Sequence, residues 1–192
     1  LRIVTRLERR YAGFDGMNLT WETLEGLVKH NGPLLGPDGR PTARYAERGI
    51  PVAILEYQER QDLWLDSHAS AEAQAAALAD DIAYDSHDID DGLRAGLFDL
   101  GDLRAIPFLA GLLDEIDALH PGLELGRVTN ELIRRVITRF VEDVIAVAEQ
   151  RIAALAPADA DAIRRAGAPV IAFSAPVAAA DAAIKAFLFP NV

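Results

Sequence analysis

Apolar side chains recur every three or four residues along most of this sequence, a spacing that restricts the chain to helices packed on one another. The clearest case lies between Thr129 and Leu155, where five residues share one helical face: Leu132, Val136, Phe140, Val144 and Ala148. Such a stripe has to be buried against another element. Alternation of apolar and polar residues long enough for a half-buried strand is absent. The sequence therefore predicts an all-α fold.

Capping residues and helix stops predict where further helices begin and end. Thr20 is a suitable N-cap for a helix over residues 21–30, which Asn31-Gly32-Pro33 would end. Ser70 is a suitable cap for a helix that continues at least to Asp91. The same signals predict helical segments at residues 1–11, 106–119, 159–166 and 177–189.

Three segments depart from this helical pattern. Glycine and proline recur through residues 32–50, which we expect to be a long loop with a functional or interface role. Residues 50–58 fit a short strand and a helix start equally well, and residues 169–174 are compatible with an extended segment.

Composition limits the classes of function. Hydrophobic residues make up 51% and charged residues 26% of the chain, as in a globular protein. No apolar run approaches the roughly 20 residues of a membrane-spanning helix. The net charge of −11 argues against sequence-independent binding to nucleic acid, although a divalent cation and a few basic side chains can still hold a triphosphate. The absence of cysteine excludes disulfides and thiolate metal ligands, and fits a cytoplasmic location.

Residues 71–96 carry the densest set of reactive side chains. At 100° per residue, one face of this helix is an apolar core stripe: Leu78, Ile82, Ile89 and Leu93. The opposite face carries Asp80, Tyr84, His87 and Asp91, with Asp88 at its margin. Six aspartates fall within twelve residues: Asp80, Asp81, Asp85, Asp88, Asp90 and Asp91. Like charges three or four residues apart cost roughly 0.2–0.5 kcal/mol per pair, so helix stability does not explain them.

Two interpretations of this acidic face are open on the residues alone. A run of charges is most often a solvated helix face. The alternative is a surface that faces a divalent cation or a substrate, where a carboxylate is a ligand, the tyrosine packs against or hydrogen-bonds a sugar, and the histidine titrates.

Two separate motifs resemble the deoxyguanosine-triphosphate triphosphohydrolase-like family of the HD superfamily. The first is residues 18–33 (NLTWETLEGLVKHNGP), and the second is residues 72–74 (EAQ) followed by 79–84 (ADDIAY) and 87–91 (HDIDD). The resemblance covers essentially the whole chain. It implies an HD-type helical fold and metal-dependent hydrolysis of dGTP or other deoxynucleoside triphosphates to deoxynucleoside and tripolyphosphate, in a homo-oligomer.

The resemblance also implies roles for individual residues. Such enzymes hold a divalent metal ion, such as Mg²⁺ or Mn²⁺, with a histidine, a His-Asp doublet and a distant aspartate. The distant aspartate matches Asp80, because a tyrosine and a second aspartate follow it by four and eight residues. Those residues, Tyr84 and Asp88, match positions that lie against the deoxyribose and its 3′ hydroxyl. The dipeptide His87-Asp88 imitates the metal-binding doublet, but it lies beyond the distant aspartate.

The first metal ligands are expected before Leu1, so the fold is expected to be incomplete at its N-terminus and the fragment inactive alone. The resemblance divides the chain into residues 1–100, the C-terminal portion of the metal-binding domain, and residues 101–192, a family-specific helical region packed on it. No catalytic residue is assigned within the fragment.

Two other functions are open. One is a non-catalytic oligomerisation or nucleotide-sensing module of the same fold, and the other is an HD phosphohydrolase that acts on another nucleotide and uses Asp80 without needing Tyr84. Four arginines on the long helix, Arg127, Arg134, Arg135 and Arg139, are expected to pair with acidic side chains, with a triphosphate or effector site as the alternative.

Overall fold

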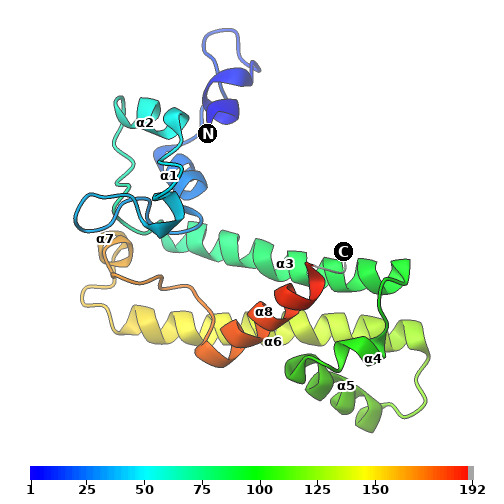
Figure 1. The fold of residues 1–192 in the computed structure, drawn as a ribbon. Coiled ribbons are helices and arrows are strands. Elements are labelled where there is room, and N and C mark those ends of the chain that lie inside the picture. The colour runs from blue at the N-terminus through cyan, green and yellow to red at the C-terminus, as the bar shows by residue number, and fades with distance from the viewer. Residues whose placement is uncertain (190–192) are drawn as a thin grey trace. The chain divides into compact units, whose positions relative to one another are not determined.

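The computed structural model describes residues 1–189 and consists of helices joined by loops (Figure 1). Within these residues there is no strand, and β-type pairing is limited to two isolated bridges, Arg9 with Gly16 and Leu35 with Pro41. The prediction of an all-α fold is confirmed. In the same residues, no helix is both long enough and apolar enough to cross a membrane.

Residues 1–189 contain eight α-helices and two short helical turns. The α-helices are α1 (Trp21–Lys29), α2 (Val52–Gln58), α3 (Ala71–Ala95), α4 (Leu100–Leu103), α5 (Pro107–Leu119), α6 (Leu125–Ala153), α7 (Ala160–Arg164) and α8 (Ala175–Leu188). A π-helical turn, η1 (Ile3–Leu7), and a 3-10 turn, η2 (Ala43–Tyr45), precede α1 and α2 respectively.

The predicted caps begin the helices that they were expected to begin. The Thr20 hydroxyl accepts a hydrogen bond from the backbone N–H of Thr23, which begins α1. The Ser70 hydroxyl accepts from the N–H of Ala73 and begins α3 in the same way. These contacts satisfy backbone donors that the first helical turn leaves free.

Other segments differ from the prediction. Residues 1–11 form only the five-residue turn η1, and residues 50–58 resolve into helix α2. Helix α4 was not predicted, because four residues are too few to show a helical period. Its start depends on a reciprocal cap, in which Asp99 accepts from the N–H of Asp102 and Asp102 accepts from the N–H of Asp99.

The chain folds into two compact units, each with its own apolar core. Unit 1 comprises Leu1–Ala77 and Gln150–Ile171, and unit 2 comprises Leu78–Glu149 and Ala172–Val192. The buried residues of the unit 1 core are Leu24, Val28, Leu34, Ile54, Leu63 and Leu65. The resemblance divides the chain near residue 100 by the roles of its two parts, not by their packing, and that division stays a prediction.

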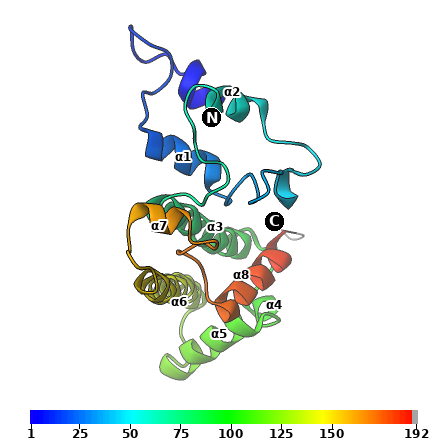
Figure 2. The ribbon, with the colours of Figure 1, turned by 90° about the vertical axis from the view of Figure 1, so that its left-hand side faces the viewer.

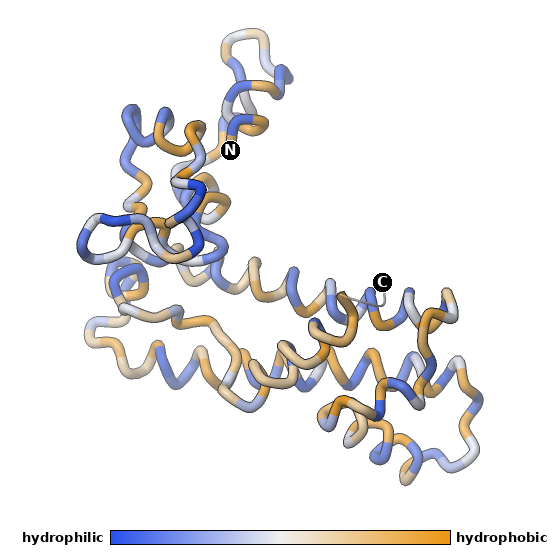
Figure 3. Tube along the Cα trace, in the orientation of Figure 1, coloured by the Kyte–Doolittle hydropathy of each residue, from blue (hydrophilic) through white to orange (hydrophobic). Residues whose placement is uncertain are grey.

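The core of unit 2 is built mainly from α3, α5, α6 and α8. Ile82 and Ile89 of α3 are buried there, as the helical spacing predicted, and Leu93 packs against them. Helix α8 is bonded at its start to α6, since the N–H and hydroxyl of Ser174 both donate to Asp143. Further along α8, the ammonium of Lys185 lies 3.6 Å from Asp81 of α3. Both ribbon views show helix α8 beside α3 (Figures 1 and 2). Apolar residues predominate along α8, whereas polar and apolar residues intermingle along α3 (Figure 3).

Gly92 provides the space that the end of α3 needs against the following loop. A Cβ atom at this position would lie 2.3 Å from the ring of Phe98. That ring is buried and packs edge-on against Phe187, with centroids 5.1 Å apart. Any larger side chain would have to displace a ring that is already held on two sides.

We predict that Gly92→Ala lowers the free energy of unfolding by about 1–3 kcal/mol, because overpacking outweighs the roughly 1 kcal/mol that alanine gains in a helix. Gly111→Ala on α5 is the matched control, since its Cβ would meet no atom within 4 Å. It should stabilise the protein by up to about 1 kcal/mol. Urea unfolding of both variants tests the pair, and equal stabilisation by the two would contradict the steric argument.

Candidate functional site

Helix α3 places Asp80, Tyr84 and Asp88 one above another on a single face, because they are four residues apart. We call these three residues the α3 stripe. Asp80 is exposed, the Tyr84 side chain is 66% exposed, and Asp88 is partly buried. Within residues 1–189, none of the three side chains has a hydrogen bond or an ion pair. The polar atoms of the stripe are therefore free to meet a ligand.

Neighbouring aspartates on the same helix are engaged by other side chains. Asp90 accepts a hydrogen bond of 2.8 Å from Arg94. Asp81 lies 3.6 Å from the ammonium of Lys185. The structure thus separates Asp81 and Asp90, which have hydrogen-bond or ion-pair partners, from Asp80, Asp88 and Asp91, which have none among the residues that it describes.

Asp85 is the exception on α3, because it is a carboxyl group in the interior of unit 2. It is 2% exposed and lies beside Asp181 and Lys185 of α8. Burial, followed by the hydrogen bond with Asp181, raises the pKa of Asp85 to about 8, and Lys185 only partly offsets this rise. Asp85 follows Leu78 by seven residues, so helical geometry places it on the apolar face, although the sequence analysis did not single it out as buried.

The α3 stripe offers oxygen ligands of the kind that Mg²⁺ and Mn²⁺ prefer. Among the side chains that the structure describes, however, no three His, Cys, Asp or Glu residues converge in a way that could hold a metal ion. Asp80 alone is therefore not a metal site. Its metal role, and the substrate roles of Tyr84 and Asp88, stay predictions.

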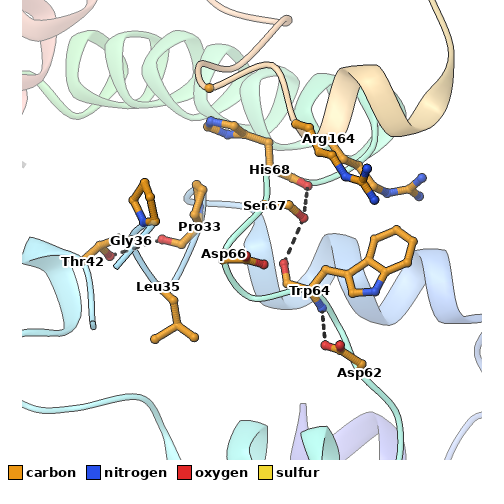
Figure 4. Close-up of a pocket in the computed structure, with 13 residues that line it drawn as sticks. Pro33, Leu35, Gly36, Thr42, Asp62, Trp64, Asp66, Ser67, His68 and Arg164 are labelled. Atoms are coloured by element: carbon orange, nitrogen blue, oxygen red, sulfur yellow. Dashed lines mark hydrogen bonds between the residues drawn. The ribbon is translucent and has the colours of Figure 1, made fainter. Parts of the chain in front are cut away.

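Unit 1 contains a cavity of about 830 Å³ that the sequence analysis did not anticipate (Figure 4). Three loops line it: one from the Gly/Pro-rich segment (Pro33, Leu35, Gly36, Pro37, Thr42), one before α3 (Asp62, Trp64, Asp66, Ser67, His68) and one around the end of α7 (Arg164, Arg165, Gly167). Its size is within the range of small-molecule sites, about 300–1,000 Å³. The long loop therefore contributes to a hollow surface, which is in keeping with more than a connecting role.

A buried charge network fixes the loop before α3. Arg164 donates two hydrogen bonds, of 2.8 and 2.9 Å, to the two carboxylate oxygens of Glu25. Lys29 lies 2.8 Å from the same carboxylate and also donates to the carbonyl of Trp64 and the hydroxyl of Ser67. Burial lowers the pKa of Lys29, although Glu25 opposes the shift. Two cations and one anion thus share the interior of unit 1.

The backbone at Trp64 has a φ of 50°, in the left-handed region that a bulky residue rarely adopts. The guanidinium of Arg164 lies 5.5 Å from the ring of Trp64 and 5.1 Å from that of Trp21, close enough for cation–π attraction to both. The two indoles pack edge-on, with centroids 4.8 Å apart. These contacts hold Trp64 in its unusual conformation, with both tryptophans packed around the same guanidinium.

Sequence reasoning could have found only half of this network. Glu25 and Lys29 lie four residues apart on a predicted helix, which indicates an ion pair. Arg164 is 139 residues from Glu25 in the chain, so no local pattern connects them.

The four arginines of α6 pair with acidic side chains, as expected. Arg134 and Arg135 both bind Glu131, and their hydrogen bonds lower the pKa of this glutamate to about 2. Arg139 contacts Glu115 and Glu142, and Arg127 lies 4.0 Å from Glu124.

We predict that Arg164→Lys lowers the free energy of unfolding by about 2–4 kcal/mol, because a lysine cannot reproduce the paired hydrogen bonds to buried Glu25 or the contact with two indoles. Arg165→Lys is the control, since this neighbouring residue is exposed and should change stability by less than about 0.5 kcal/mol. Equal losses in denaturant unfolding would show that the buried network is not the cause.

Comparison with known proteins gives matches along the whole chain. It is 58% identical over 193 residues to a Deoxyguanosinetriphosphate triphosphohydrolase-like protein of Allorhizobium ampelinum, covering 100% of this chain and 46% of the relative. Proteins of the same description from Azorhizobium caulinodans and Rhodopseudomonas palustris are 56% and 54% identical over 192 residues, again covering all of this chain and 48% of each relative.

The chain spans about half the length of the curated relatives that it matches. No family model matches it. The resemblance inferred from residues 18–33 and 72–91 is confirmed.

Proposed function

We propose that this chain, similar along its whole length to Deoxyguanosinetriphosphate triphosphohydrolase-like proteins, is part of an enzyme that hydrolyses deoxynucleoside triphosphates to deoxynucleoside and tripolyphosphate. The observation that carries the proposal is the α3 stripe, in which two carboxylates and a phenol hydroxyl follow one another at four-residue spacing on one helix face, without a partner among the residues that the structure describes. The HD-type fold implied by the resemblance agrees with the helical architecture.

Asp80 would hold a divalent metal ion from the α3 side through one carboxylate oxygen. A bound ion supplies the means to polarise the α-phosphate and to lower the pKa of an attacking water. The remaining ligands of the ion would come from residues outside the fragment, as the resemblance implies.

Tyr84 and Asp88 would bind the sugar. They lie one helical turn apart, at a spacing that lets one small ring contact both side chains. The exposed ring of Tyr84 offers an apolar surface for the deoxyribose, and the Asp88 carboxylate accepts a hydrogen bond from its 3′ hydroxyl. Their role in this proposal is to bind and orient the substrate, whereas Asp80 acts through the metal ion.

We predict that Asp80→Asn in the full-length protein removes the bound metal and lowers the rate of tripolyphosphate release roughly 100-fold or more, because the Lewis acid is lost. Metal content by elemental analysis and product release from each dNTP, with Mg²⁺ or Mn²⁺, are the two readouts. Glu72→Gln is the control, since it removes an exposed carboxylate from the first turn of the same helix. Full metal content and rate in Asp80→Asn would refute the assignment.

We predict that Asp88→Asn raises KM for dNTPs about 10-fold or more and leaves the metal content unchanged, because a hydrogen bond to a charged group is worth about 1.5–3 kcal/mol. A 2′,3′-dideoxynucleoside triphosphate tests the partner atom. Its lack of the 3′ hydroxyl should weaken binding to the unmodified enzyme and make little further difference to Asp88→Asn. Independent, additive losses would mean that Asp88 contacts another part of the substrate.

The same assays separate the other two functions. Hydrolysis of a different nucleotide, dependent on Asp80 and indifferent to Tyr84→Phe, would indicate an HD phosphohydrolase of other specificity. Absence of hydrolysis in the full-length protein would indicate a binding or oligomerisation module. Assembly into a homo-oligomer and a cytoplasmic location remain proposals.

A further inference from the structure

The contact between α3 and α8 in unit 2 holds three carboxyl groups and only one ammonium group. Asp81 and Asp85 lie on α3, and Asp181 and Lys185 lie on α8. The Lys185 ammonium is 3.0 Å from Asp181 and 3.6 Å from Asp81. One cation cannot neutralise three anions, and like charges in an interior of low polarity repel strongly.

Asp85 and Asp181 are the two members of this group with little access to water. Asp85 is 2% exposed and the Asp181 side chain 15% exposed, whereas that of Asp81 is 56% exposed. Asp85 Oδ2 and Asp181 Oδ1 are buried atoms that receive no hydrogen bond from any N–H or hydroxyl group that the structure describes. Their side chains nevertheless lie within hydrogen-bonding reach of each other. Two carboxylates have no donor, so this hydrogen bond requires a proton on one of them.

We propose that Asp85 and Asp181 share a single buried proton, and that this singly charged pair is a positioning element that ties α8 to α3 and holds the α3 stripe in place. Lys185 then neutralises the one remaining charge of the pair, with Asp81 at the rim. The proton thereby gives the buried oxygen Asp85 Oδ2 the hydrogen-bonding partner that it otherwise lacks, while Asp181 Oδ1 stays 3.0 Å from the Lys185 ammonium.

The pair is linked to the stripe through the helix itself. Asp85 directly follows Tyr84 and lies one turn from Asp88 and one turn from Asp81. An ionised Asp85 would face like charges on both sides along the helix, in addition to Asp181 across the contact. Loss of the proton is therefore expected to loosen α8 from α3 in the segment that carries Tyr84 and Asp88. The effect on substrate binding rests on the proposed function, whereas the shared proton does not.

The charged groups that face Asp85 set the direction of the pH dependence. Burial, Asp181 and Asp81 raise the pKa of Asp85, and Lys185 lowers it. The net effect is a pKa of about 8 for Asp85. Burial lowers the pKa of Lys185, but the hydrogen bond and charge of Asp181, with the charges of Asp85 and Asp81, outweigh burial. The net effect raises the pKa of Lys185, so its ammonium stays charged over the pH range in which Asp85 titrates. In the unfolded chain Asp85 ionises near its ordinary value of 3.8. The folded state therefore binds the extra proton, and stability falls as pH rises from about 4 to about 8.

The test compares three variants of the full-length protein by thermal unfolding across this pH range. Asp85→Asn supplies a permanent N–H donor to Asp181, so its melting temperature should rise relative to the unmodified protein by several degrees as pH increases. Asp181→Asn should also abolish the loss of stability that the unmodified protein shows as pH rises, because Asp85 can then ionise beside Lys185. Glu142→Gln removes an exposed carboxylate of α6 and should show a difference that does not vary with pH. If the melting temperatures of Asp85→Asn and Asp181→Asn both differ from that of the unmodified protein by an amount that does not vary with pH, the proposal is overturned.

Infrared difference spectroscopy gives a direct readout that needs no activity. The unmodified protein should show a protonated carboxylic acid band that disappears as pH rises through about 8, and both single variants should lack it. Persistence of the band in Asp85→Asn would assign the proton elsewhere and overturn the proposal. If the protein hydrolyses dNTPs, KM should rise in alkaline solution for the unmodified enzyme and stay level for Asp85→Asn. A lack of hydrolysis would count against the proposed function and leave the spectroscopic and thermal tests decisive for the shared proton.

Discussion

Helix α3 has to bury one face and present another, and the arrangement of unit 2 depends on how it does so. Ile82 and Ile89 are drawn into a core with residues of α5, α6 and α8, and their burial orients the helix. Once these two residues face inward, the geometry of a helix places Asp80 and Tyr84 outward. The hydrophobic contact thus fixes the direction of side chains that take no part in it. The candidate site is a consequence of packing on the opposite face of the same helix.

Both units bury charged groups, and each does so with partners from distant parts of the chain. In unit 1, Glu25, Lys29 and Arg164 share a buried interior in which Glu25 contacts both basic groups. In unit 2, Asp85, Asp181 and Lys185 share a second buried interior, where the proton on the carboxyl pair leaves one negative charge for Lys185 to neutralise. Breaking such a group leaves an unpaired charge inside the protein, which costs more than the group itself contributes. These networks therefore act as constraints on how the segments come together more than as sources of stability.

Much of the helical architecture could be predicted from the sequence because its signals are local. The Thr20 and Ser70 caps each act within three residues, and the stripes of α3 and α6 repeat over several turns. The α3 stripe was likewise visible as spacing, and its motif directed attention to Asp80, Tyr84 and Asp88. Helix α4, the turn η1 and the cavity of unit 1 were not visible. They depend on segments too short to show a period, or on loops whose shape is set by the side chains around them.

The sequence by itself determined that the chain is helical, where its main helices begin, and which side of α3 is apolar, because these properties follow from backbone geometry and neighbouring residues. Only the tertiary structure decided which of the six aspartates on α3 are paired, free or buried. Arg94, which pairs with Asp90, is local, but the partners of Asp81 and Asp85 are Lys185 and Asp181, about a hundred residues further along the chain. The charge state of an aspartate depends on the groups that surround it in space, so the shared proton at Asp85 exists only once α8 has packed against α3.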